Sequence, residues 1–228
     1  MTPHPVPDES SPDSTPSLVS PTVPPSLLTT EGIPLKLGIM ASGNGSNFEA
    51  IARAIFALQL NAQIQVLIYN NPGAKVALRA ANWGVPAVVL NHHDFQCRED
   101  LDQQIVQTLR HYQVEWVIMA GWMRLVTSVL IDAFPDQIIN IHPSLLPSFR
   151  GVRAVEQAIE AGVKITGCTV HIVSLEVDSG PILLQAAVPV LPDDTKETLH
   201  ARIQVQEHRI LPPAIALAAS IKTHGARK

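Results

Sequence analysis

The alternation of short apolar runs with longer amphipathic segments is the feature that most limits how this chain can fold. From Leu35 onward, short apolar runs flanked by Gly, Pro, Asn or polar residues are expected to be buried strands: Leu35–Met40, Ile64–Tyr69, Ala87–Leu90, Trp116–Met119 and Ile138–Ile141. Between them lie patterns of helix length: Phe48–Leu60, Ala74–Trp83, Arg98–His111 and Leu125–Ala133. Strands that alternate with helices predict a parallel sheet with right-handed crossovers.

The rhythm changes after the fifth of these strands. The later sequence predicts a short helix, two longer strands and a terminal helix, over Ala154–Ala161, Ile165–Val173, Ile182–Val190 and Thr195 to about Ala219. We therefore expect a single α/β domain over residues 35–228. Its sheet would be open, Rossmann-like and mostly parallel, flanked by helices, with a mixed C-terminal extension.

The first 34 residues differ sharply in composition from the rest. They hold nine prolines and eleven serines or threonines, and they contain neither Lys nor Arg. Such a segment buries too little apolar surface to offset the entropy lost on ordering, so we predict a disordered tail over residues 1–34. Without basic residues it fits neither a secretory signal nor an Arg-rich transit peptide, which makes the cytoplasm the expected compartment.

Overall composition narrows the classes of partner. Of 228 residues, 46% are hydrophobic, which is enough for a substantial core, and the formal net charge is −4. The basic residues do not cluster and no run of about 18 apolar residues occurs, so we expect neither a nucleic-acid nor a membrane partner. Cys97 and Cys168 lack the spacing of a metal site or a disulfide framework.

A glycine-rich loop, Ala41–Asn47, joins the first strand to the first helix. At this position an open α/β sheet presents backbone N–H groups and a helix N-terminus to an anion. The dinucleotide pattern fails because Phe48 takes the place of its third glycine and the second strand ends in Asn70-Asn71 without an acid; no lysine follows for a P-loop. The loop predicts a phosphomonoester site, with an ordinary capped turn as the alternative.

Asn140, His142 and Asp178 form a candidate catalytic group. Asn140 and His142 stand two residues apart at the carboxyl end of the fifth strand, so they can face the same way. Pro143 and Pro147 restrict the loop that follows. Asp178 lies in the loop between the two later strands, and a carboxylate beside an imidazole favours the imidazolium and raises its pKa. A structural role for His142 is the alternative.

Other chemistries fit less well. A Ser/His/Asp hydrolase would use Ser46 or Ser144, but neither lies in a G-x-S-x-G elbow. His92-His93-Asp94 lacks the spacing of a helical zinc pair and His171 is expected to be a structural strand histidine, so we expect no metal. By itself, the polar patch on the terminal helix is typical of a solvated helix face; it comprises Arg202, Gln204, Glu207, His208 and Arg209.

Four motifs in this order carry a resemblance: Ala41–Asn47, Ala120–Arg124, Asn140–Pro147 and Asp178–Ile182. Over about residues 35–220 the chain resembles the phosphoribosylglycinamide formyltransferases, the folate-dependent GAR transformylases of purine synthesis. The histidine loop and the later aspartate are similar throughout the wider superfamily, which includes methionyl-tRNA formyltransferase and formyltetrahydrofolate hydrolase. The glycine-rich loop points to the GAR enzymes.

The resemblance implies a formyltransferase fold and a reaction. A formyl group would pass from the co-substrate N10-formyltetrahydrofolate to the amine of 5'-phosphoribosylglycinamide (GAR), by direct attack and without a covalent enzyme intermediate. Asn140 and His142 would stabilise the oxyanion, while Asp178 would keep His142 charged and help to move a proton, through water.

The resemblance also implies binding residues. Those for GAR are Gly45, Ser46, Asn47, Gln204 and Glu207, and those for the folate are Arg98, Met123, Arg124, Leu125, Val126 and Asn140. The expected partners are these two small molecules, and the expected assembly is a monomer or homodimer. The alternatives are a formyltetrahydrofolate hydrolase, another formyl-folate-dependent formyltransferase, and a noncatalytic folate or nucleotide binder, which would not need His142 and Asp178 together.

Overall fold

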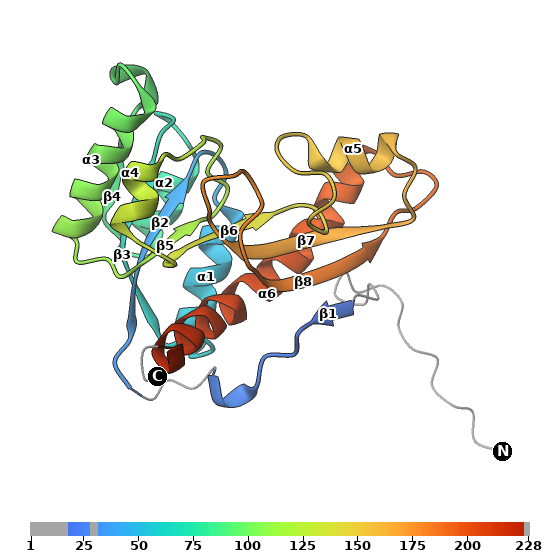
Figure 1. Ribbon diagram of the computed structural model, residues 1–228, viewed down its shortest axis with the longest axis horizontal. Coiled ribbons are helices and arrows are strands. Elements are labelled where there is room, and N and C mark those ends of the chain that lie inside the picture. Colours follow the sequence, from blue (N-terminus) through green and yellow to red (C-terminus); the bar gives the residue numbers. More distant parts are fainter. Residues whose placement is uncertain (1–17, 28–31, 226–228) are drawn as a thin grey trace.

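The computed structural model describes residues 18–27 and 32–225. Its strands are β1 (Leu18–Ser20), β2 (Leu35–Ala41), β3 (Ala62–Tyr69), β4 (Ala87–Val89), β5 (Trp116–Met119), β6 (Ile138–His142), β7 (Ile165–Ile172) and β8 (Ile182–Pro189). They form one sheet in the order β1-β8-β7-β6-β5-β2-β3-β4 (Figure 1). Pairing is parallel from β4 through β6 and antiparallel from β6 through β1. The predicted fold class is confirmed.

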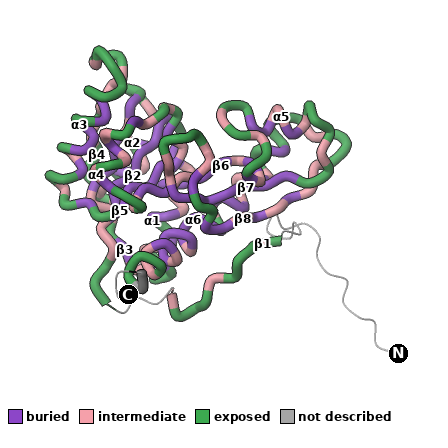
Figure 2. Tube along the Cα trace, in the orientation of Figure 1, coloured by how far each residue is buried: buried purple, intermediate pink, exposed green. Residues whose placement is uncertain are grey.

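Helices cover both faces of this sheet. They are α1 (Ser46–Phe56), α2 (Val76–Asn82), α3 (Arg98–His111), α4 (Ser128–Ala133), α5 (Ala154–Glu160) and α6 (Lys196–Gly225), with 3-10 turns η2 (Pro25–Leu27) and η3 (His92–Asp94). One core cluster packs α1, α2 and α6 against the sheet, and a second packs α3 and α4 against the opposite face. Figure 2 shows this burial as purple along the strands and the inner sides of the helices.

The start of α4 differs from the expected one. The predicted helix began at Leu125, whereas α4 begins at Ser128. Thr127 explains the difference: its hydroxyl accepts a hydrogen bond from the Val129 N–H at 3.3 Å, and its own N–H donates to the Asp102 carboxylate at 2.5 Å. This N-cap stops the helix from extending backwards. Residues 123–126 are therefore a loop after β5.

The N-terminal segment is more ordered than predicted. Residues 18–20 form β1, which pairs antiparallel with residues 185–187 of β8, and η2 packs near α6. Val19 and Val23, both half-buried, pack against the core. The prediction of disorder is wrong for this stretch, because β8 offers an unpaired edge on which even a three-residue strand gains hydrogen bonds. Residues 1–17 and 28–31 lie outside the described residues.

The topology decides where a ligand can bind. Strands β6, β5 and β2 are adjacent and parallel, so their carboxyl ends share one edge of the sheet. The segments after Ala41, Met119 and His142 thus emerge side by side at the position where open α/β sheets bind ligands. None of the helices in the described part of the chain is long and apolar enough to span a bilayer.

Candidate active site

Four polar side chains meet where β6 and β7 pair. Asn140 and His142 project from β6, and the antiparallel register places His171 of β7 opposite Asn140. Asp178, in the β7–β8 loop, lies between the two histidines: its Oδ2 is 3.3 Å from His142 Nδ1 and its Oδ1 is 3.5 Å from His171 Nε2. The structure therefore brings the three predicted catalytic residues together and places a further side chain, that of His171, beside them.

His171 fixes the amide of Asn140. Its Nδ1 donates to the Ile172 carbonyl at 2.9 Å, which fixes the orientation of the ring and turns Nε2 towards Asn140 and Asp178. Asn140 Nδ2 lies 3.1 Å from that Nε2. This contact holds the amide in place, and an N–H of its NH2 group remains available to a ligand oxygen.

His142 faces an acceptor on each side. Its Nε2 lies 2.8 Å from the Phe149 carbonyl, and its Nδ1 faces Asp178. Only the imidazolium, with two N–H groups, satisfies both partners. The Phe149 carbonyl belongs to the loop that follows β6, whose Gly151 N–H also donates to Asp178 Oδ2 at 2.8 Å. A ligand oxygen can therefore reach His142 Nε2 only when this loop backbone moves aside.

Asp178 is held as a carboxylate. Burial works to raise the pKa of Asp178, but the contact with His171, the hydrogen bond from Gly151 and the nearby His142 ring outweigh it and hold that pKa below 3.8. At neutral pH the group is ionised and accepts hydrogen bonds only. It can thus orient a histidine or a water molecule and receive a proton.

His171, which the sequence predicts to be a structural strand histidine, belongs to this cluster. It is 2% exposed and stands in an otherwise apolar strand, so nothing in the local pattern marks it as functional. An antiparallel pairing of β6 with β7 places a polar residue of β7 beside Asn140. His171 can be identified as that residue only when the register between the two strands is known.

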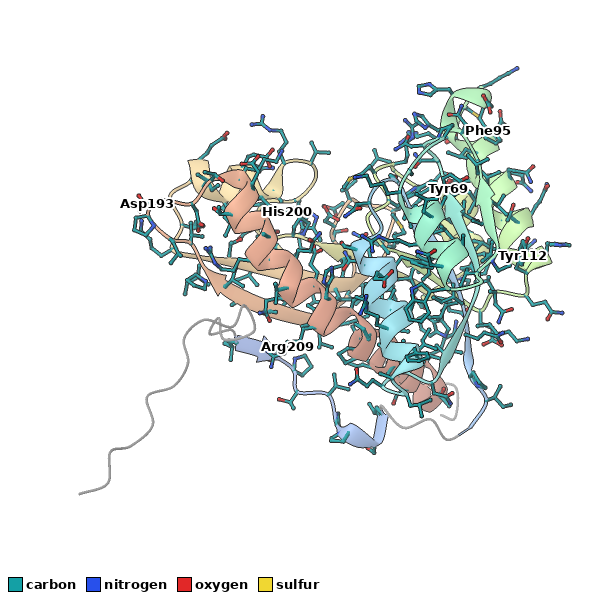
Figure 3. All side chains as sticks on the ribbon, turned by 180° about the vertical axis from the view of Figure 1, so that it is seen from behind. Tyr69, Phe95, Tyr112, Asp193, His200 and Arg209 are labelled. Atoms are coloured by element: carbon teal, nitrogen blue, oxygen red, sulfur yellow. The ribbon has the colours of Figure 1, made fainter. Side chains whose placement is uncertain are left out.

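At the start of α1, the glycine-rich loop meets α6. The two helices pack side by side (Figure 3). Gln204 Nε2 donates to Ser46 Oγ at 2.9 Å, and Asn47 Nδ2 donates to Glu207 Oε2 at 2.9 Å. With Gly45 at the N-cap of α1, the structure brings together all five residues expected to bind GAR. Because Ser46 Oγ accepts from Gln204, its hydroxyl proton is left for a ligand.

The carboxyl of Glu207 and the Oδ1 atom of Asn47 are both buried between α1 and α6. Burial raises the pKa of Glu207, although the hydrogen bond from Asn47 opposes that effect. The Asn47 Oδ1 atom is buried and has no partner within the described residues. A buried acceptor without a donor is uncommon in proteins and suits a site completed by a ligand or water.

Gly45 is required by space as well as by its backbone angles. Its φ is +75°, in the left-handed region. A Cβ atom built on it would lie 2.4 Å from Val76 Cγ2 and 2.6 Å from Val76 Cβ, at the start of α2. The loop and α2 are therefore in contact at this glycine, and no larger residue fits without displacing one of them.

Apart from Asn140 on β6, the residues expected to bind the folate occupy the loop after β5 and the start of α3. Met123 and Leu125 are 77% and 53% exposed, which is unusual for large apolar side chains and suits the wall of a binding site. The Nε atom of Arg124 is buried without a partner in the described chain. Arg98 is an exposed residue at the N-terminus of α3.

This loop is tied to the glycine-rich loop. The Met123 N–H donates to Ser42 Oγ at 2.9 Å, and the Ser42 N–H donates to the Gly121 carbonyl at 3.0 Å. The expected folate-binding and GAR-binding segments are thus adjacent. Across residues 18–27 and 32–225, no group of three or more His, Cys, Asp or Glu side chains is arranged to hold a metal ion.

Comparison with known proteins agrees with this geometry. The family model described as formyl transferase matches residues 35–215. The chain belongs to the formyl transferase family. It is 40% identical over 190 residues to the phosphoribosylglycinamide formyltransferase of Bacillus subtilis, covering 83% of this chain and 97% of that protein. The resemblance to phosphoribosylglycinamide formyltransferases that the sequence motifs predicted is confirmed.

Other relatives are much longer or have known structures. Identity to the trifunctional purine biosynthetic protein adenosine-3 of Drosophila pseudoobscura pseudoobscura is 43% over 187 residues, covering 81% of this chain but only 14% of that protein. The chain therefore spans a small part of such multifunctional relatives. The crystal structure of glycinamide ribonucleotide transformylase 1 from Symbiobacterium toebii superposes with a TM-score of 0.82 at 44% identity, over 83% of this chain and 90% of that one.

In this formyl transferase neither candidate serine is placed to be a nucleophile activated by His142. Ser144 Oγ donates to the Ser148 carbonyl at 2.5 Å. Ser46 Oγ is paired with Gln204 on another helix. Both nitrogens of His142 are occupied by other groups. The arrangement gives no support to an acyl-enzyme on either serine.

Proposed function

We propose that the protein transfers the formyl group of N10-formyltetrahydrofolate to the amine of GAR, yielding formyl-GAR and tetrahydrofolate in purine biosynthesis. The observation that carries the proposal is the shared sheet edge. The pairs Ser46–Gln204 and Asn47–Glu207 lie on the same edge as Asn140, His142 and Asp178. A phosphate site beside an oxyanion-stabilising cluster suits a phosphorylated amine substrate. The similarity to the Bacillus subtilis enzyme of that name supports the same substrate.

GAR would be held by its phosphate and its ribose. The N-terminus of α1 presents Gly45 and Ser46 to the phosphate, with the Ser46 hydroxyl proton as a further donor. Gln204 supports that hydroxyl. Glu207, whose carboxyl is buried beside Asn47, would accept hydrogen bonds from ribose hydroxyls.

The chemistry needs donors for a developing oxyanion and a route for one proton. As the amine nitrogen bonds to the formyl carbon, the carbonyl oxygen becomes negative; the free N–H of Asn140 and the Nε2–H of His142 would stabilise it, once the Phe149 carbonyl has moved away. The bond from the formyl carbon to N10 then breaks. A proton passes from the attacking nitrogen to N10, and Asp178 would relay it through water.

The formyl donor would bind along the loop after β5. Met123 and Leu125 offer apolar surface, and the loop backbone offers hydrogen-bonding groups for a pterin, with Arg98, Arg124 and Val126 lining the same site. The proposal includes no metal. It keeps the cytoplasm as the compartment and a monomer or homodimer as the assembly.

The test is a transfer assay with purified protein, GAR and N10-formyltetrahydrofolate, followed by the absorbance of the folate product. We expect product only when GAR is present, and far less with dephosphorylated GAR. Folate conversion at the same rate without GAR would replace this proposal with a formyltetrahydrofolate hydrolase. Equal use of both forms of GAR would remove the phosphate site from it.

A further inference from the structure

Three consecutive carbonyls of the glycine-rich loop are bound by one short segment, residues 71–79. The pairs are Asn71 Nδ2 with the Ser42 carbonyl at 2.6 Å, the Val76 N–H with the Gly43 carbonyl at 3.1 Å, and Arg79 Nε with the Asn44 carbonyl at 2.8 Å. The three donors differ in kind: a side-chain amide, a backbone amide and a guanidinium. Together they hydrogen-bond all three carbonyls on the side of the loop that faces residues 71–79.

Peptide planarity turns this into an orientation of the opposite side. In a trans peptide the C=O and the following N–H point in opposite directions. With the three carbonyls facing residues 71–79, the N–H groups of Gly43, Asn44 and Gly45 face away from that segment. None of these N–H groups donates to a described acceptor of the chain. Successive free N–H groups facing one side form an anion-binding concavity.

Arg79 is held in place from behind. Its Nη1 lies 3.4 Å from Glu49 Oε2, and the Trp83 Nε1–H donates to the same carboxylate at 3.2 Å. Burial works to raise the pKa of Glu49, but the hydrogen bonds from Trp83 and the neighbouring arginines hold it below its ordinary value, so the carboxylate stays ionised. The guanidinium therefore has a fixed anchor on α1 while Nε reaches the loop.

We infer that Arg79 is a positioning residue for the substrate phosphate, acting by fixing the Asn44–Gly45 peptide so that the Gly45 N–H faces the anion. The inference rests on the proposed function and deepens it. Arg79 does not need to touch the phosphate, and its Nε–H is the atom that matters. The ligand it serves is a phosphomonoester dianion bound by backbone amides.

Two neutral substitutions separate this role from the effect of positive charge. In Arg79→Gln, the amide nitrogen follows Cδ as Nε does in arginine, so a donor to the Asn44 carbonyl is kept and the charge is lost. In Arg79→Met, both are lost at similar length. Arg53→Met is the matched control, because Arg53 pairs with Glu49 at 3.0 Å from the exposed side of α1.

For Arg79→Met we expect the KM for GAR to rise about tenfold or more, the effect of losing one charge-assisted hydrogen bond. The kcat and the KM for the formyl donor should stay within about twofold, as for uniform binding lost from one substrate. Arg79→Gln should stay within about threefold of wild type, and Arg53→Met within about twofold. Equal losses in the Gln and Met variants would show that charge alone acts and would overturn the inference, as would a wild-type KM in Arg79→Met.

A binding experiment separates this inference from the proposed function. Inorganic phosphate is titrated into 15N-labelled protein and the amide signals of residues 43–47 are followed by NMR. We expect these signals to shift in wild type and Arg53→Met, and to shift at about tenfold higher phosphate concentration in Arg79→Met. No shift in wild type would count against the phosphate site of the proposed function. A shift at the same concentration in wild type and Arg79→Met would overturn only the role of Arg79.

Discussion

The glycine-rich loop and the candidate catalytic cluster, which comprises Asn140, His142, His171 and Asp178, lie on one sheet edge but are built in opposite ways. The loop offers backbone N–H groups, and side chains from a neighbouring segment, Asn71 and Arg79, set their direction. The cluster offers side chains, and backbone groups set their direction: the Ile172 carbonyl orients His171, and the Gly151 N–H binds Asp178.

This difference determines what each region tolerates. A group that acts through its backbone is sensitive to volume and to φ, and much less to side-chain chemistry. A group that acts through its side chain is sensitive to a change in its charge or in its hydrogen-bond donors and acceptors, even when its shape is preserved. Substitutions in the glycine-rich loop should therefore impair function by displacing the backbone. Substitutions in the cluster should impair function while the structure stays intact.

The largest effect is expected from changing chemistry at constant shape in the cluster. Asp178→Asn keeps the size of the side chain but removes the carboxylate that faces His142 and His171, and His142→Ala removes a donor to the oxyanion. Each should lower kcat by roughly 10² to 10³, while the KM for GAR changes little. Steady-state kinetics measure both quantities.

Glu176→Gln is the matched control for Asp178→Asn. Glu176 lies in the same loop, but its side chain is 74% exposed and pairs with Arg150 on the surface. Its loss should leave kcat within about twofold. Turnover near that of wild type in Asp178→Asn or in His142→Ala would break the contrast between the two regions.

Adding one methyl group to the loop tests the opposite sensitivity. Gly45→Ala would place Cβ 2.4 Å from Val76 Cγ2 at a φ of +75°, so we expect the free energy of unfolding to fall by about 2–4 kcal/mol. In Gly43→Ala the added Cβ meets no atom within 4 Å, and the change should be below about 0.5 kcal/mol. Denaturant unfolding measures both. Equal losses in the two variants would show that the loop does not discriminate by space.

A smaller effect is expected from removing an ion pair at the start of α6, which lies outside both the loop and the cluster. Asp194 pairs with Arg202 at 2.6 Å, and the hydrogen bonds from Arg202, only partly opposed by burial, lower the pKa of Asp194 to about 2. Asp194→Asn should cost about 1–2 kcal/mol of unfolding free energy at pH 7, with the KM for GAR unchanged. The measurement is denaturant unfolding across a pH series.

The pH dependence of that loss has a definite sign. The folded pKa of Asp194 lies below its unfolded value, so its stabilisation is complete above about pH 4 and declines as the pH falls towards 2. The gap between wild type and Asp194→Asn should therefore narrow through that range. A gap independent of pH would mean that the ion pair is not its source.

Local patterns in the sequence were enough to predict most helices and strands and part of the candidate site. Apolar periodicity placed the strands from β2 to β8, and the motif at the end of β6 placed Asn140 and His142. What could not be predicted depends on partners far away in the chain. His171 joins the cluster through its register with Asn140, and the start of α4 depends on Asp102, in another helix. A three-residue strand such as β1 has too few residues for periodicity to show.

Strand β1 also bears on how copies of the protein meet one another. Without it, β8 would be an outer strand of eight residues with alternating buried positions, and its free N–H and C=O groups could pair with the same strand of a second molecule. The N-terminal segment occupies that edge at residues 185–187, in the middle of β8, and is followed at once by Pro21, which has no N–H to donate. We therefore expect a chain lacking this segment to self-associate more readily at high concentration, because all eight residues of the β8 edge would then be open to pairing.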